Sequence, residues 1–186
     1  MTENSLQGSD AKIVAESSIH EDQTLIGDVD RIQQVLLNLV SNAGKFLPKT
    51  HGIIKLESSL IEEGDQVHLQ ISVIDNGPGI SEEFRPKLFQ PFSKHEVHKK
   101  VNPNGNGLGL NICKLICRNL GGDIKFDPSQ DGTKFTFWVA AKKPKEHDFD
   151  LLLTPGREVV LQQEMKITTH GKVNMAALLE RNPNLR

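Results

Sequence analysis

Two asparagines and a lysine within one predicted helix have the side chains best suited to metal and phosphate chemistry. Asn38, Asn42 and Lys45 lie in residues 29–46, where apolar residues recur with the period of an amphipathic helix. At about 100° per residue, the three side chains fall on one stripe outside the apolar face. Amide oxygens are good ligands for a hard divalent cation, and a lysine ammonium is a compact charge for a phosphate. An ordinary solvated helix face is the alternative that this segment alone leaves open.

Three further segments suited to a purine or a phosphate follow in order along the chain. Residues 75–80 read Asp-Asn-Gly-Pro-Gly-Ile, residues 89–92 read Phe-Gln-Pro-Phe, and residues 105–110 read Gly-Asn-Gly-Leu-Gly-Leu. Each segment is a weak signal alone, but all four in this order are a specific one.

Asp75 ends a predicted strand in which the apolar residues at every second position lie on its own side of the sheet. A carboxylate in such a buried row is costly unless a hydrogen-bond donor meets it. The exocyclic amine of adenine is such a donor, and Gly77 and Gly79 would let a purine approach the backbone without a Cβ in the way. An Asx turn at the strand end is the alternative. The sequence favours the adenine interpretation.

Alternating glycines stand immediately before another predicted helix. Gly105, Gly107 and Gly109 free the backbone to turn successive N–H groups toward an anion, and the helix dipole adds to that attraction. A flexible hinge is the alternative. The segment is not a Walker A loop, because no Gly-Lys-Ser/Thr follows, and it lacks the dinucleotide-binding spacing.

Phe89 and Phe92 flank Pro91 at the start of a long segment, residues 93–106, that has few apolar side chains. Core packing is the plain interpretation of the two phenylalanines. A loop of this length inside a compact domain is usually functional.

In this order the four segments resemble the ATP-binding catalytic domain of histidine protein kinases, part of the ATPase group that also holds DNA gyrase, the Hsp90 chaperones and MutL. The resemblance covers residues 10–142, approximately, and implies ATP and Mg²⁺ as ligands. It implies Asn42 as the Mg²⁺ ligand, Lys45 as a phosphate contact and Asn38 as an assisting residue. The nucleotide contacts that it implies are Asp75, Gly77, Gly79, Ile80, Phe89, Phe92, Gly105, Gly107, Leu108, Gly109, Leu110 and Thr133.

The resemblance also assigns roles within that set. Asp75 would select adenine with the support of Thr133. Phe89 and Phe92 would anchor a lid, residues 93–106, that closes on the nucleotide. The lid sequence departs from the family at one position, where Asn106 stands in place of the usual serine or threonine but keeps a hydrogen-bonding side chain.

Asn38 separates the kinase branch from its hydrolysing relatives. Those relatives carry at this place a glutamate that activates water as a general base. An amide cannot take a proton, so the site is expected to hold MgATP with slow hydrolysis and to spare the γ-phosphoryl group for a protein acceptor. The phenylalanine segment, which gyrase and Hsp90 relatives lack, favours the same branch.

The histidine that such a kinase phosphorylates is not expected within this sequence. His20, followed by Glu21 and Asp22, superficially fits the acceptor pattern, but it lies in a predicted turn. The resemblance therefore implies a separate histidine-bearing dimerisation domain as partner, in cis or in trans, and a response-regulator receiver domain downstream. A serine kinase of the same fold and a non-catalytic ATP-sensing module are the alternatives, while Asn38 disfavours a hydrolysing ATPase.

Periodicity predicts an α+β two-layer sandwich, in which about three helices cover one face of a mixed, mainly antiparallel sheet. The expected helices are residues 29–46, 81–89 and 108–120, and the expected strands are residues 12–18, 24–26, 53–61, 67–75, 123–127 and 133–141. The domain is expected to span residues 11–142. A disordered segment, 1–10, would precede it, and 143–186 would be a linker or an extension that packs back on the sheet.

The composition indicates no nucleic-acid or membrane partner for this segment. The net charge is −2, and no apolar run approaches the 18 residues, roughly, that a membrane span needs. We expect a cytoplasmic domain, which other parts of a full-length protein could anchor to a membrane. Cys113 and Cys117, four residues apart on a predicted helix, are expected to be reduced core residues.

Overall fold

The computed structural model describes residues 4–5, 11–20, 23–93, 106–129, 132–144 and 165–168. The strands are β1 (Asn4–Ser5), β2 (Lys12–Ser17), β3 (Thr24–Gly27), β4 (Ile53–Glu63), β5 (Gln66–Asp75), β6 (Asp123–Ser129), β7 (Gly132–Ala141) and β8 (Met165–Thr168). The helices are α1 (Val29–Phe46), the 3-10 helix η1 (Arg85–Lys87) and α3 (Gly109–Asn119).

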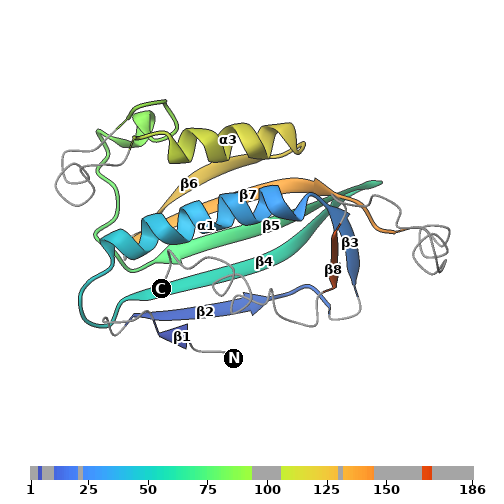
Figure 1. Ribbon diagram of the computed structural model, residues 1–186, viewed down its shortest axis with the longest axis horizontal. Coiled ribbons are helices and arrows are strands. Elements are labelled where there is room, and N and C mark those ends of the chain that lie inside the picture. The colour runs from blue at the N-terminus through green and yellow to red at the C-terminus, as the bar shows by residue number, and fades with distance from the viewer. Residues whose placement is uncertain are drawn as a thin grey trace.

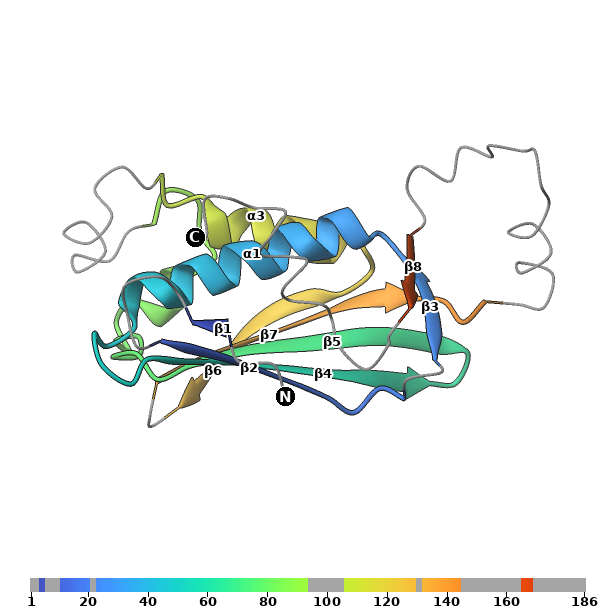
Figure 2. The same ribbon diagram turned by 60° about the horizontal axis from the view of Figure 1, so that its bottom comes forward.

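Six strands form one sheet in the order β1-β2-β4-β5-β7-β6. β2 runs parallel to β4, and the other neighbouring strands are antiparallel. Figures 1 and 2 show α1 and α3 lying side by side over one face of this sheet. The predicted α+β sandwich with a mixed, mainly antiparallel sheet is confirmed.

The core lies between the two α-helices and the sheet face that they cover. α1 buries its apolar stripe there, namely Ile32, Val35, Leu36, Leu39, Val40 and Ala43. On the facing strand β5, the alternating residues Val67, Leu69, Ile71, Val73 and Asp75 are all buried, which confirms the predicted row. No helix among the described residues has the length and hydropathy of a membrane-spanning segment.

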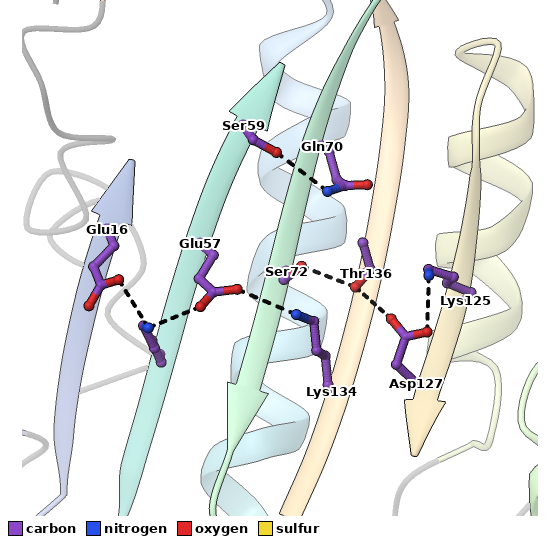
Figure 3. Close-up of polar contacts among 10 residues, drawn as sticks. Glu16, Glu57, Ser59, Gln70, Ser72, Lys125, Asp127, Lys134 and Thr136 are labelled. Atoms are coloured by element: carbon purple, nitrogen blue, oxygen red, sulfur yellow. Dashed lines mark hydrogen bonds and ion pairs between the residues drawn. The ribbon is translucent and has the colours of Figure 1, made fainter. Parts of the chain in front are cut away.

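The opposite face of the sheet carries a row of charged and hydroxyl side chains (Figure 3). Glu57 pairs with Lys55 at 3.0 Å and with Lys134 at 3.4 Å. Further along the same row, Thr136 Oγ1 donates to Asp127 Oδ2 at 3.0 Å. Exposed ion pairs of this kind stabilise a fold little. A sheet with one apolar and one charged face needs helices on one side only, which accounts for the two layers.

The third expected helix is reduced to a short turn. Within residues 81–89 only the 3-10 helix η1 forms, and its N-cap position is Phe84 rather than Ser81. Pro86 lies inside this segment, where it provides no N–H donor and restricts the residue before it. The prediction of a helix over residues 81–89 was therefore wrong.

Both flanking segments contribute strands that the sequence did not predict. β1 pairs with the start of β2, although residues 1–10 were expected to be disordered. β8, from the C-terminal extension, pairs antiparallel with β3, so this part of the extension lies against the domain. Strand pairing between distant segments is non-local, and periodicity within one segment cannot predict it.

α1 begins with a side-chain cap that should stabilise the whole domain. Asp28 Oδ1 accepts a hydrogen bond from the Arg31 N–H at 3.0 Å. Asp28→Ala removes this acceptor and should lower the free energy of unfolding by about 1 kcal/mol. Asp28→Asn keeps a side-chain oxygen and should cost much less. Urea unfolding measures both variants, and equal losses would show that the cap is not the cause.

Candidate functional site

Three chain segments meet on the helical side of the sheet, namely the C-terminal half of α1, the end of β5 and the start of α3. A Cβ on Gly77, just after β5, would lie 3.0 Å from the carbonyl oxygen of Phe46 at the end of α1. A Cβ on Gly109, the first residue of α3, would lie 2.7 Å from Asn38 Oδ1. Only glycine permits approaches this close. The structure therefore brings α1, with its two asparagines, next to the segment after Asp75 and next to Gly109 at the end of the segment 105–110.

Asp75 is the buried carboxylate of this region, with 8% of its surface exposed. Its Oδ1 accepts a hydrogen bond from the Gly77 N–H at 2.8 Å, which is the Asx turn that the sequence left open. Thr133, its pairing partner on β7, also bonds to the carboxyl group. Burial raises the pKa of Asp75, and the hydrogen bonds from Gly77 and Thr133 oppose that shift. A carboxylate has about four lone-pair sites, so it can still accept from a ligand.

The raised pKa of Asp75 predicts a pH-dependent cost to folding in the absence of a ligand. Below the ordinary pKa of 3.8 the group is protonated in both states, and the cost is absent. As the pH rises through the higher pKa of the folded state, the buried carboxylate ionises and destabilises the fold. Asp75→Asn should therefore melt at a higher temperature than wild type above that pKa, and at the same temperature below 3.8. Thermal unfolding across this range measures the difference, and a gap that widens as the pH falls would contradict it.

Asn38, Asn42 and Lys45 form a line of hydrogen bonds along α1. Asn42 Nδ2 donates to Asn38 Oδ1 at 3.3 Å, and Lys45 Nζ donates to Asn42 Oδ1 at 3.5 Å. The two asparagines are half-buried and the lysine is exposed. The stripe predicted from helical periodicity is thus present, with an amide oxygen beside a cation.

The glycine segment places the start of α3 against residues 92–93. Gly107 has a φ of 65°, and a Cβ there would lie 2.8 Å from the carbonyl oxygen of Ser93, so the two ends of the predicted lid meet. α3 then begins at Gly109, where Leu108 at the N-cap position supplies no side-chain hydrogen bond to the first turn. Gly105 and the rest of the lid, residues 94–105, lie outside the described residues.

Further predicted nucleotide contacts are apolar residues and a glycine. Ile80 and Leu110 are half-buried and pack against the core. Gly79 has a φ of 72°, and a Cβ there would lie 3.3 Å from the carbonyl oxygen of Gly132. Gly132 itself lies so close to the carbonyl oxygen of Asp75 that a Cβ would collide with it. Sequence reasoning did not include Gly132, although its place directly before Thr133 was the available signal.

The two predicted lid phenylalanines differ in their surroundings. Phe89 packs edge-on against Phe135 with 6.2 Å between ring centroids, and Lys114 Nζ lies 4.7 Å from the Phe89 centroid. Phe92 is 74% exposed and has a φ of 62°. The core-packing interpretation therefore holds for Phe89 but not for Phe92.

Cys113 is the residue near these asparagines whose position sequence reasoning missed. Cys113 and Cys117 are both free and buried, as predicted for core residues. In addition, Asn38 Nδ2 donates to Cys113 Sγ at 3.3 Å. The spacing from Gly109, one helical turn, was the signal that could have placed Cys113 on the face of α3 that meets α1.

Comparison with known proteins identifies relatives of the domain. The sequence model of the family described as "Histidine kinase-, DNA gyrase B-, and HSP90-like ATPase" matches residues 27–143. The chain is 41% identical to the sensor histidine kinase GacS of Pseudomonas protegens over 126 residues, which cover 67% of this chain and 13% of that protein. It thus spans only a small part of this curated relative.

Solved structures of histidine kinases have the same fold. The catalytic domain of ThkA is 33% identical, with a TM-score of 0.58 over 73% of this chain and 82% of that one. A structure of ThkA with the response regulator TrrA gives 31% identity and a TM-score of 0.52 over 70% of this chain and 34% of that one. Full-length ShkA in complex with AMPPNP gives 28% identity and a TM-score of 0.58 over 72% of this chain and 26% of that one. The chain therefore belongs to the histidine kinase-, DNA gyrase B- and HSP90-like ATPase family, as a catalytic domain of the histidine kinase type.

Proposed function

We propose that this chain binds MgATP and transfers the γ-phosphoryl group to a histidine on a separate dimerisation domain, as the kinase step of two-component signalling. The observation that supports this most is that α1 meets both the segment after Asp75, at Phe46, and the start of α3, at Asn38. Two groups of polar side chains belong to this region. One is Asp75, a buried carboxylate that can accept a further hydrogen bond. The other is the line of Asn38, Asn42 and Lys45 on α1. A nucleotide with its base at Asp75 and its phosphates along α1 fits this arrangement.

In the proposed complex, Asp75 accepts a hydrogen bond from the exocyclic amine of adenine. This donor offsets the cost of the buried charge, which in the described part of the chain is met by Gly77 and Thr133. The residues present are compatible with a ligand at this carboxylate, because a Cβ at position 77 would lie 2.8 Å from Asp75 Oδ1 and crowd it, and glycine avoids this. The half-buried side chain of Ile80 would supply apolar contact to the base.

The phosphates would lie between α1 and the start of α3. Asn42 Oδ1 would ligate Mg²⁺, Lys45 would contact phosphate oxygens, and the N–H groups of Gly107 and Gly109 would face the anion, with Leu108 and Leu110 packing beside them. The donor set fits, since among the described residues the amide oxygen of Asn42 accepts a long hydrogen bond of 3.5 Å from an exposed lysine and no other. When bound, Mg²⁺ neutralises charge on the phosphates. Phe89 and Phe92 would hold the start of the lid.

Phosphoryl transfer needs mainly positioning and charge stabilisation from the protein. The bond from the γ-phosphorus to the β,γ-bridging oxygen breaks, its electron pair leaves with ADP, and an imidazole nitrogen of the acceptor forms the new bond. Asn38 cannot act as a base toward water, which favours transfer over hydrolysis. Within this account, Asn38 holds Asn42 rather than activating a nucleophile.

The proposed partners follow from this reaction. A histidine-bearing dimerisation domain, in cis or in trans, accepts the phosphoryl group, and a response-regulator receiver domain receives it downstream. The complex of the histidine kinase ThkA with the response regulator TrrA supports a partner of this kind. The charge balance of this chain, 22 lysines and arginines against 24 acidic residues, offers no reason to add a nucleic-acid partner.

Transfer of radiolabel tests the proposal. The full chain is incubated with ATP labelled at the γ-phosphate, Mg²⁺ and histidine-bearing helical domains of histidine kinases. We expect label on the acceptor that is lost in acid, as from phosphohistidine. Acid-stable label would indicate the serine kinase alternative, and ATP binding without transfer to any acceptor would indicate an ATP-sensing module.

A further inference from the structure

The hydrogen bonds that join Lys45, Asn42 and Asn38 along α1 continue into the core of the domain. Lys45 donates to Asn42 at 3.5 Å, and Asn42 donates to Asn38 at 3.3 Å. Asn38 Nδ2 then donates to Cys113 Sγ at 3.3 Å, and Cys113 Sγ donates to the carbonyl oxygen of Val35 at 3.9 Å. Every donor in this line points the same way, from the exposed lysine to the buried backbone of α1.

The thiol of Cys113 determines which end of the Asn38 amide, the NH₂ group or the oxygen, faces the sulfur. Cys113 is 1% exposed, and burial raises the pKa of its thiol to about 11, so the group stays protonated at neutral pH. Its S–H is directed at the carbonyl oxygen of Val35, which leaves the sulfur lone pairs facing Asn38. A lone pair accepts a hydrogen bond from the amide NH₂ and repels the amide oxygen. Asn38 is therefore held with its NH₂ group toward Cys113.

The amide orientation of Asn38 fixes the amide orientation of Asn42. When its NH₂ group donates to the sulfur, Asn38 turns its oxygen toward Asn42. Asn42 then has to donate to that oxygen from its own NH₂ group. The amide oxygen of Asn42 is then left on the side of Lys45. If Asn38 were reversed, Asn42 would reverse with it and would offer an NH₂ group, which cannot ligate a cation. Gly109 packs directly against Asn38 Oδ1, which leaves this amide little room to move.

We propose that Cys113 is a positioning residue for the metal site. Its buried thiol sets the amide orientation of Asn38, and through Asn38 it presents Asn42 Oδ1 to the cation of MgATP. Cys113 contacts neither the nucleotide nor the metal in this account. The inference rests on the proposed function, because it assigns to Asn42 the role of the Mg²⁺ ligand.

The test separates the metal-dependent part of ATP affinity from the rest. Calorimetry of the full chain gives the dissociation constant of ATP with Mg²⁺ and with EDTA, and the ratio of the two constants is the gain due to metal. Cys113→Ala and Cys113→Val remove the hydrogen bonds, and each should lower this ratio roughly three- to tenfold while changing the affinity for metal-free ATP less than about twofold. Cys113→Ser keeps a donor and an acceptor and should restore the ratio.

Cys117 supplies the matched control. It lies one turn further along α3 and is equally buried, and no hydrogen bond joins it to Asn38 among the described residues. Cys117→Ala should destabilise the domain by a similar amount and leave the ratio unchanged. A wild-type ratio in both Cys113→Ala and Cys113→Val would overturn the inference, as would an equal loss in Cys117→Ala. If the wild-type chain bound no ATP, the proposed function and this inference would both fail. If it bound ATP with a gain from Mg²⁺ that the Cys113 variants did not change, this inference alone would fail.

Discussion

Replacing Asp75 with asparagine is expected to weaken ATP binding roughly ten- to a hundredfold, because a hydrogen bond to a charged group is worth about 1.5–3 kcal/mol. The fold should survive, since the variant has the same shape and removes a buried charge that Gly77 and Thr133 only partly satisfy. Isothermal titration calorimetry of wild type and variant with ATP measures the loss directly.

Selectivity for the base gives a second measurement of the same contact. GTP presents a carbonyl oxygen where ATP presents an amine, and two acceptors facing each other repel, so wild type should bind GTP poorly. Asp127→Asn is the matched control, because Asp127 accepts from Thr136 on the face of the sheet opposite the helices (Figure 3). Equal affinities of wild type for ATP and GTP would remove Asp75 from the nucleotide site.

Replacing Asn42 with alanine should abolish the Mg²⁺-dependent part of ATP affinity. Loss of an outer partner of a metal ligand already costs about 10–100-fold in metal affinity, and loss of the ligand itself should cost at least as much. Binding of metal-free ATP should change little, because Asp75 and the glycines are untouched. Asn42→Asp should retain the metal, since a carboxylate is also an oxygen ligand, yet misplace the triphosphate. Titrations with Mg²⁺ and with EDTA distinguish these outcomes.

Gln34 provides the control for Asn42. It lies on the same helix, two turns earlier, and is exposed with a hydrogen bond from Arg31 at 2.9 Å. Gln34→Ala removes an amide of similar chemistry without reaching the proposed site, so its gain from Mg²⁺ should match that of wild type. An Asn42→Ala variant that binds MgATP as well as wild type would remove Asn42 from the metal site.

Sequence reasoning worked best where the signals are local. The bounds of α1 are those expected, because a long apolar period, the Asp28 cap and Pro48 all act within one segment. The burial of Asp75 likewise follows from the two-residue period of β5. The approach of Gly109 to Asn38 could be anticipated only through the family resemblance, because the two residues are far apart in the sequence.

The features that were missed depend on contacts between distant segments. The pairing of β3 with β8 and the hydrogen bond from Asn38 to Cys113 each join parts of the chain that share no local pattern. For Phe92 the plain alternative of core packing fails, since the side chain is 74% exposed and the residue has a φ of 62°. Sequence period predicts which face of an element is buried, but it does not predict which other element covers that face.

Release of phosphate from MgATP by the full chain, with and without an acceptor domain, tests the central claim most directly. That claim is that the site holds ATP for transfer because Asn38 stands where a hydrolysing relative has a general base. Without an acceptor, the account predicts ATP binding with little phosphate release over hours. With a histidine-bearing helical domain present, it predicts label on that domain instead. Brisk steady-state hydrolysis by the chain alone, lost in Asn38→Ala, would contradict the account and place the chain among the hydrolysing ATPases.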